Sequence, residues 1–180
     1  MRQESEMDTI GLLIGDYDPP TLDYNRAAEI LSSMRDIDQT WLCPVSSGDD
    51  VQNATIANML TVLSTDMSSS GKTMSACTVA LNKGATSPKD ALILCRFMFP
   101  YLKFKAALIG SHAFFQLPEE DFFVFRFASE DRASSTGTPI VLGKFARAGE
   151  TKALIAAGRD ESRNFCPAVW DYIKSKGIYR

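Results

Sequence analysis

Short apolar runs alternate with segments of helical periodicity along almost the whole chain, and this alternation limits the fold more than any other feature. The runs predict strands over residues 9–14, 39–45, 73–81, 104–109 and 139–145. The periodic segments predict helices over residues 23–34, 51–63, 88–99, 150–157 and 167–175, the first with Asp23 as its N-cap. Residues 64–70 are rich in serine and predict a loop.

Strands and helices that alternate in this way are typical of a parallel sheet with helices on both faces. The predicted fold class is therefore α/β, with the last two helices forming a small C-terminal helical part. No internal repeat or linker divides residues 1–180, so we expect one domain. Ligands of such sheets bind beyond the carboxyl ends of the strands, where the strand order reverses. Residues 15–24 and 110–113 are therefore the candidate site.

The composition is that of a globular protein, with 45% hydrophobic and 23% charged residues. A net charge of −3 disfavours a nucleic-acid partner, because dedicated nucleic-acid binders usually carry a basic excess. No apolar stretch approaches the ~20 residues of a membrane span, and the N-terminus is acidic and polar, unlike a secretory signal. We therefore expect no membrane association and a cytoplasmic location.

The four cysteines are scattered and show no Cys-x-x-Cys spacing. Three of them lie inside apolar runs, which predicts free, buried thiols in a reducing compartment. The spacing indicates no metal site. The four are Cys43, Cys77, Cys95 and Cys166.

The loop after the first predicted strand carries the most specific motif, Gly-Asp-Tyr-Asp-Pro-Pro-Thr-Leu-Asp-Tyr over residues 15–24. It resembles the first signature of the nicotinate/nicotinamide mononucleotide adenylyltransferases, a G-x-F-[DN]-P-P-[HT]-x-x-H loop that opens a helix. Residues 158–179 resemble the C-terminal pattern of that family, and residues 41–45, 76–84 and 107–118 resemble segments between the two ends. The matches occur in the same order along nearly the whole chain.

The resemblance implies a Rossmann-like nucleotidylyltransferase fold and a role in NAD biosynthesis. In that family the phosphate of a pyridine mononucleotide attacks the α-phosphorus of ATP and pyrophosphate leaves, normally with magnesium. The implied substrates are thus Mg-ATP and a pyridine mononucleotide, if the protein is active. The resemblance implies catalytic positions at Thr21, Tyr24 and Lys152, and nucleotide-binding positions at Gly15, Asp16, Tyr17, Gly110, His112 and Arg147.

Several of these positions depart from the family pattern. Tyr24 stands where the signature ends in histidine, and a phenol carries no positive charge at neutral pH. His112 replaces an aspartate, and Lys152 replaces an arginine that would reach the distal phosphates in a two-pronged contact. Thr55 and Ile56 occupy the places of a His-Arg pair. This pattern predicts impaired or lost catalysis.

Two alternatives remain open on the sequence alone. The protein could be a non-catalytic, nucleotide-binding regulator or a subunit of a larger assembly, with a protein partner or a second copy. It could also transfer a nucleotidyl group to a different acceptor. Phenylalanines at 122, 123, 125 and 127 favour a core or partner surface over a base-stacking platform, and the acidic residues 119–121 favour a solvated turn. Residues 70–73 end like a phosphate-binding P-loop but lack its first glycine, and residues 134–136 mimic a Ser-Ser-Thr motif in a loop.

Overall fold

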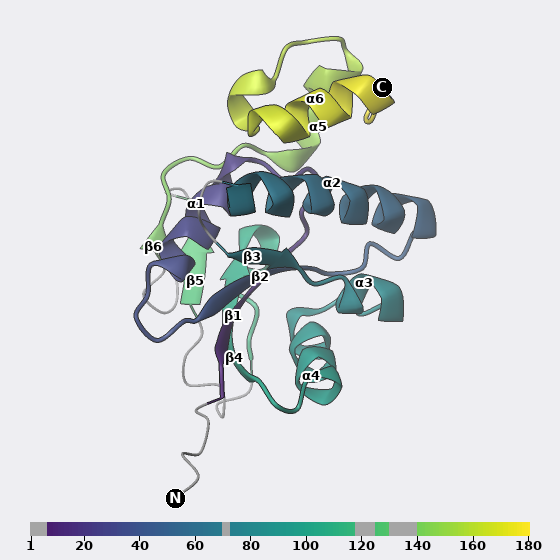
Figure 1. Cartoon of the computed structure of the whole chain (residues 1–180). Helices are drawn as coiled ribbons and strands as arrows, with labels where there is room; N and C mark the ends of the chain where they lie inside the picture. Colours follow the sequence, from purple (N-terminus) through teal and green to yellow (C-terminus); the bar gives the residue numbers. More distant parts are fainter. Residues whose placement is uncertain (1–6, 70–72, 118–124, 130–139) are drawn as a thin grey trace, which may run out of the picture.

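The computed structural model describes residues 7–69, 73–117, 125–129 and 140–180. A parallel sheet of six strands forms its centre, in the order β3-β2-β1-β4-β5-β6 (Figure 1). This confirms the predicted α/β class with a Rossmann-like sheet. The strands are β1 (Thr9–Gly15), β2 (Gln39–Pro44), β3 (Met74–Ala76), β4 (Lys103–Ile109), β5 (Phe125–Ala128) and β6 (Ile140–Val141).

The strand order reverses between β1 and β4. The chain builds outward from β1 through β2 to β3, returns to the other side of β1 as β4, and then continues outward to β5 and β6. The carboxyl ends of β1 and β4 therefore diverge into loops on opposite sides and leave a crevice between them. Residues 15–24 and 110–113 follow these two strand ends, as the sequence predicted.

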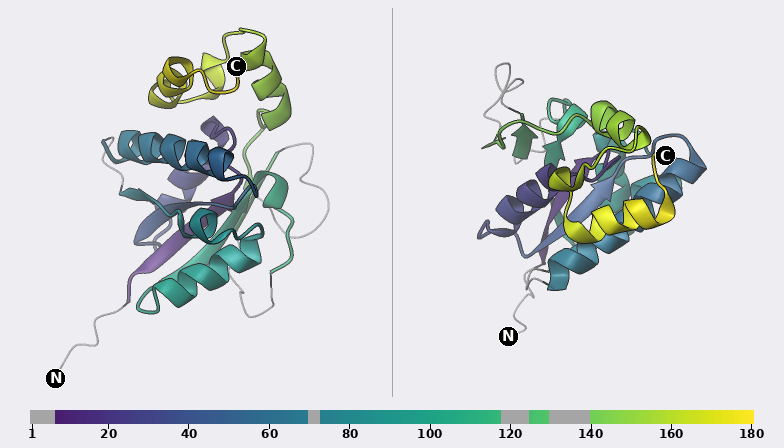
Figure 2. Two further views of the ribbon diagram at one scale, coloured as in Figure 1. Left: turned by 90° about the vertical axis from the view of Figure 1, so that its right-hand side faces the viewer. Right: turned by 90° about the horizontal axis from the view of Figure 1, so that it is seen from above.

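Alternate residues of the strands point to opposite faces of the sheet and belong to two separate hydrophobic cores. Leu13 of β1 and Phe127 of β5 point toward α1 (Leu22–Ser32) and α2 (Asp50–Ser69), whereas Leu12 of β1 points toward α3 (Val79–Lys83) and α4 (Pro88–Met98). The two faces of the sheet are thus covered by different helices (Figure 2). Each fully buried leucine or phenylalanine contributes about 1.5–3 kcal/mol to this packing, which makes the sheet a rigid support for its loops.

The C-terminal helices form a further layer outside the sheet, as predicted. α5 (Ala148–Ala156) and α6 (Pro167–Lys176) lie beyond α2 when viewed from the sheet (Figure 1). Val169 and Ile173 of α6 belong to the same buried core as Met59 and Leu63 of α2. This packing brings the last residues of the chain back toward the loop that follows β1.

The predicted third strand was wrong in its second half. β3 ends at Ala76, and the residues that follow form the short helix α3, which closes at Gly84 with a φ of 70°. An apolar run of this length fits a strand or a buried helix equally well by periodicity. The structure shows a helix here, and one side of α3, with the buried residue Ala80, packs against α4.

The predicted loop over residues 64–70 was also wrong, since α2 continues through Ser69. The hydroxyls of Ser64 and Thr65 donate to the carbonyl of Thr61 at 3.2 and 2.8 Å, so the polar side chains are satisfied within the helix. Met67 is buried against the core and holds the last turn in place.

The sheet has one strand more than predicted. β5 arises from the phenylalanine-rich segment, and Phe127 is fully buried, which confirms a core role for that residue. The predicted strand over 139–145 is shortened to β6. α1 begins one residue before the predicted start, with Thr21 at the N-cap and Asp23 in the first turn, so the predicted N-cap was wrong. Phe122, Phe123, the acidic residues 119–121, residues 70–72 and the Ser-Ser-Thr at 134–136 lie outside the described residues.

All four cysteines are free and buried, as predicted. Within the described ranges, no helix is both long enough and apolar enough to cross a membrane.

Candidate active site

The end of β1 allows no side chain at Gly15. A methyl group there would come within 2.8 Å of Ile109 Cγ2 and 2.8 Å of the Tyr24 ring. Gly110, at the end of β4, adopts a φ of 71°, which favours glycine. These two glycines let the phenol of Tyr24 lie between the ends of the two central strands.

Tyr24 is held by the backbone of the loop. Its hydroxyl accepts a hydrogen bond from the Tyr17 amide at 3.0 Å, and the two rings contact each other with centroids 4.1 Å apart and planes tilted by 31°. Tyr17 has a φ of 54° and donates its own hydroxyl to the Leu13 carbonyl at 2.7 Å. Burial raises the pKa of Tyr24 above its ordinary value, and the nearby Asp16 carboxylate raises it further, so the phenol is neutral.

Thr21 is buried at the N-cap of α1 and has its hydroxyl engaged inside the protein. Thr21 Oγ1 donates to Asp23 Oδ2 at 3.0 Å. The same oxygen of Asp23 accepts the Ala146 amide at 3.1 Å. Asp23 is a carboxylate in the first turn of a helix, where the helix dipole favours negative charge. It therefore ties the start of α1 to the segment before α5.

Asp16 links the loops that follow β1 and β4. Its carboxylate accepts hydrogen bonds from Ser111 Oγ at 2.6 Å and lies 2.7 Å from His112 Nε2. Partial desolvation raises the pKa of Asp16, but the hydrogen bonds from His112 and Ser111 lower it more, and the net pKa lies below its ordinary value. Asp16 is therefore ionised, and about half of its side chain (48%) is exposed beside the crevice.

Asp18 joins the β1 loop to the C-terminal part of the chain. Its carboxylate accepts Lys152 Nζ at 2.5 Å and the Tyr179 hydroxyl at 2.5 Å, and it also accepts the Gln52 amide. Lys152 additionally lies 5.4 Å from the centroid of the Tyr179 ring. The Asp18 side chain is only 8% exposed, whereas the Lys152 side chain is 32% exposed, so the carboxylate itself is largely shielded from water.

Two cavities meet along this loop. The larger, of about 580 Å³, lies over the ends of β1, β4 and β5, and its volume is typical of a small-molecule site. The smaller, of about 220 Å³, lies beside the end of β2 and the start of α2. Asp16 and Asp18 line both. Two adjacent cavities that share one wall suit two ligands that must be brought into contact.

The charges around the larger cavity are predominantly negative. Asp16, Asp18 and Asp23 line it, and among the described lining residues the cation is Arg147, an exposed residue at the N-cap of α5. Lys152 lines the smaller cavity, with its ammonium group bound to Asp18. A polyphosphate that entered the larger cavity would therefore meet Arg147, the start of α5 and three carboxylates.

Most residues predicted for the site from the sequence lie together. The larger cavity is lined by Asp16, Thr21, Tyr24, Gly110 and Arg147, and the smaller by Asp16 and Lys152. Gly15, Tyr17 and His112 act beside the cavities, through the close approach of Gly15 and the hydrogen bonds of the other two. Ile56 lines the smaller cavity, while the Thr55 hydroxyl donates to the Val51 carbonyl.

Asp18, Asp23, Gln52 and Tyr179 shape the site but were not among the site residues predicted from the sequence, although Asp18 and Asp23 lie within the predicted segment 15–24. Asp23 lines the larger cavity, Gln52 reaches Asp18 from α2, and Tyr179 reaches it from the end of the chain. The only sequence signal was the unusual density of carboxylates, three within eight residues of the motif. Gln52 and Tyr179 come from distant segments. Tyr179 belongs to the stretch that resembles the C-terminal pattern of the family, but nothing in the sequence indicates that either residue contacts Asp18.

No protein-family model matches the sequence, and no match appears among curated proteins. Solved structures do match. Nicotinic acid mononucleotide adenylyltransferase of Plasmodium falciparum, complexed with APC, aligns over 96% of this chain and 97% of its own, with a TM-score of 0.60 and 13% identity.

Two further structures give the same result. The Plasmodium enzyme complexed with NaAD aligns over 96% of this chain and 97% of its own, with a TM-score of 0.59 and 13% identity. A Vibrio parahaemolyticus protein, provisionally assigned as a nicotinate-nucleotide adenylyltransferase, aligns over 93% of this chain and 99% of its own, with a TM-score of 0.56 and 14% identity. The chain therefore has the Rossmann-like α/β fold of the nicotinate mononucleotide adenylyltransferases over nearly its whole length.

Proposed function

We propose that this protein is a nucleotide-binding descendant of the nicotinate mononucleotide adenylyltransferases whose turnover is impaired or lost. The larger cavity would take ATP and the smaller a pyridine mononucleotide, with Asp16 and Asp18 between them. Similar structures in complex with APC and with NaAD support nucleotides as the ligand class. The cavities also lie at the strand-order reversal, where sheets of this kind bind ligands.

The main observation in support of impaired turnover is the neutral, hydrogen-bonded phenol of Tyr24. In the resembling family a histidine at this position holds the ATP phosphates, and a histidine can carry a positive charge. Here a buried, neutral phenol accepts a hydrogen bond from the Tyr17 amide. Contacts between a charged donor and a phosphate are roughly twice as strong as neutral ones, so the substitution weakens stabilisation of the charge that develops during transfer.

The neighbouring polar groups do not restore that charge. Thr21 donates its hydroxyl to Asp23, and Lys152 is bound to Asp18. Arg147 and the first turn of α5 remain on the rim of the larger cavity. Magnesium would enter with ATP as part of the substrate, and the exposed Asp16 carboxylate is an oxygen donor of the kind that Mg²⁺ takes. These groups support binding more strongly than turnover.

A direct assay tests the proposal. Purified protein is given Mg-ATP with nicotinate or nicotinamide mononucleotide, and dinucleotide and pyrophosphate are measured. We expect turnover far below the ~10 per second of a median enzyme, together with a rise in melting temperature on addition of ATP. Turnover near the median would contradict the impairment. No stabilisation by ATP at millimolar concentration would contradict nucleotide binding.

Replacing Tyr24 tests the assignment of the impairment to one residue. Tyr24→His restores a group that can be charged at the end of the motif, and we expect at least a several-fold rise in turnover or in ATP affinity. Tyr101→His is the matched control, because Tyr101 follows α4, is 63% exposed and lines neither cavity. Equal behaviour of the two variants would show that Tyr24 does not limit the site.

A further inference from the structure

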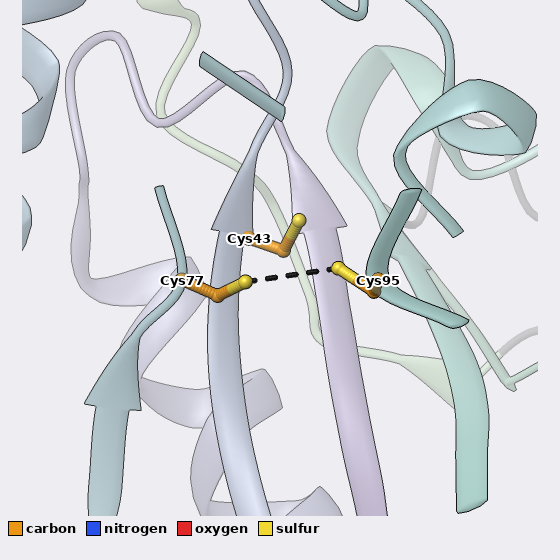
Figure 3. A group of neighbouring side chains, drawn as sticks. All are labelled: Cys43, Cys77 and Cys95. Atoms are coloured by element: carbon orange, nitrogen blue, oxygen red, sulfur yellow. Dashed lines mark hydrogen bonds between the residues drawn. The ribbon is translucent and has the colours of Figure 1, made fainter. Parts of the chain in front are cut away.

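Three of the four cysteines, far apart in the sequence, converge at one point beneath α4. Cys43 lies in β2, Cys77 directly follows β3, and Cys95 lies in α4. Their Sγ atoms all lie within 4.8 Å of one another, and those of Cys77 and Cys95 are 3.7 Å apart (Figure 3). Neither the cysteine spacing nor any family motif marks this cluster in the sequence.

Regular secondary structure holds the three thiols in place. Cys43 lies opposite Ile14 of β1, near the carboxyl end of the ladder between β1 and β2, and this pairing holds its backbone in place. The Cys77 amide donates to the Leu42 carbonyl at 2.8 Å, which extends the pairing of β2 and β3 by one residue. Cys95 projects from the buried side of α4. A ligand set supported in this way is preorganised, because its backbone need not move on binding.

The surroundings of the cluster are apolar and closed. Cys43 and Cys95 are fully buried and Cys77 is 5% exposed. Ile14, Ala80 and Leu92 belong to the same core as the three thiols. Among the residues that the structure describes, no histidine or carboxylate joins the sulfur atoms as a fourth metal ligand.

The sulfur spacing suits a shared metal ion better than a disulfide. A disulfide requires sulfurs ~2.05 Å apart, whereas the sulfurs of Cys77 and Cys95 are 3.7 Å apart. Three sulfurs ~2.3 Å from a central ion lie about 4.0 Å apart in a planar trigonal arrangement. Structural zinc sites use four ligands. A dry site with three soft sulfur ligands instead favours a soft ion that accepts three-coordination, and among biological metals this is Cu(I).

We propose that Cys43, Cys77 and Cys95 bind one Cu(I) ion through their three sulfur atoms. Each thiol that becomes a thiolate ligand releases its proton to solvent, so the affinity increases with pH. The ion would link β2, the end of β3 and α4, and would stabilise the sheet face opposite α1 and α2. The site is separate from the nucleotide cavities, so its test is independent of the proposed function.

A titration with Cu(I) tests the site in the full chain. Reduced protein is titrated anaerobically with Cu(I) in the presence of bathocuproine disulfonate as a competing chelator. We expect one ion retained per chain, a sulfur-to-copper absorption in the near ultraviolet, and an X-ray absorption spectrum with three sulfur neighbours. Release of all copper to the chelator, or a first shell containing nitrogen or oxygen, would overturn the proposal. Tighter retention of Zn²⁺ than of Cu(I) would overturn the choice of ion.

Two cysteine variants locate the ion. Cys77→Ser should lose at least 90% of the retained copper, because serine replaces a soft ligand with a hard one. Cys166→Ser is the matched control, since Cys166 is also a buried free thiol but belongs to the core on the other sheet face. Equal retention by both variants would overturn the site. If Cys77→Ser does not fold, the number of sulfur neighbours in the wild-type spectrum decides.

Discussion

Single residues at the end of β1 determine how the candidate site is built. Gly15 lies so close to Tyr24 that the phenol can pass over the strand end and meet the backbone of its own loop. A histidine in place of Tyr24 would be shorter and would leave the Tyr17 amide to another acceptor. The close approach and the tyrosine thus support each other, and the loop has a stable conformation without a bound phosphate.

Gly15→Ala should destabilise the protein by about 1–3 kcal/mol, the usual cost of overpacking a buried site. The added methyl group would lie 2.8 Å from both Ile109 and Tyr24. Gly149→Ala is the control, because nothing lies within 4 Å of a methyl group there and the residue is in α5. That variant should be unchanged or more stable by up to about 1 kcal/mol. Urea unfolding measures both, and equal values would contradict the close approach.

Asp18→Asn should lower the free energy of unfolding by about 2–3 kcal/mol, since it removes the charge from a buried acceptor of several hydrogen bonds. Lys152 and Tyr179 both donate to this carboxylate at 2.5 Å. The control is Asp171→Asn, which removes one partner of an exposed ion pair 3.1 Å long with Lys174. Such pairs contribute less than ~1 kcal/mol. Similar losses in both variants would show that Asp18 is no more than a surface charge.

At the scale of helices and strands, the predictions from the sequence succeeded where local residues determine the element. β1, β2, β4 and α4 have strong periodicity and clear ends, and α4 begins at Pro88 directly after its N-cap Ser87, whose side chain accepts the Asp90 amide. Their existence followed from local residues. The split of residues 73–81 into β3 and α3 did not, because it depends on packing under α4. Likewise, the sequence predicted where the cavities lie. It could not predict that Asp18, Lys152 and Tyr179 converge, because this depends on how α5 and α6 pack against the rest of the protein.

The contact between the β1 and β4 loops should weaken in acid. The pKa of Asp16 in the folded protein lies below its ordinary value of 3.8, so the stabilisation is fully present above that value and is lost as the pH falls through the lower, folded-state pKa. The side chain is half exposed, so the contribution is less than ~1 kcal/mol. The difference in unfolding free energy between wild type and Asp16→Asn should shrink below about pH 4. A difference that stays constant from pH 6 to pH 3 would contradict this.

At the scale of the whole molecule, the loop that follows β1 and the C-terminal part of the chain meet at one carboxylate. Asp18 follows the first strand and Tyr179 is the penultimate residue, 161 positions later. Lys152 of α5 contacts both of them. The C-terminal helices are therefore attached to the sheet layer at two places, by the apolar contact of α6 with α2 and by this polar cluster beside the smaller cavity.

This arrangement predicts that the tail and α5 stabilise the protein as one unit. Tyr179→Phe removes the hydrogen bond from the hydroxyl to Asp18 and should lower the free energy of unfolding by about 1–2 kcal/mol. For a chain of this size, each kcal/mol corresponds to a decrease of roughly 2–4 °C in melting temperature. Lys152→Ala should cost a similar amount. Because both side chains donate to the same carboxylate, the double variant should differ from the sum of the single ones by at least about 0.5 kcal/mol.

The two single variants and the double variant form a double-mutant cycle, for which Tyr172→Phe is the control. This change removes a hydroxyl from α6, the preceding helix, and leaves Asp18 and its donors intact. Combined with Lys152→Ala it should give additive effects within about 0.5 kcal/mol, as substitutions that share no partner do. Additivity in the Tyr179 cycle as well would mean that the tail and α5 contact Asp18 independently. Coupling only in the Tyr179 cycle would mean that a ligand displacing Lys152 from Asp18 must also loosen the C-terminal tail, which links the smaller cavity to the end of the chain.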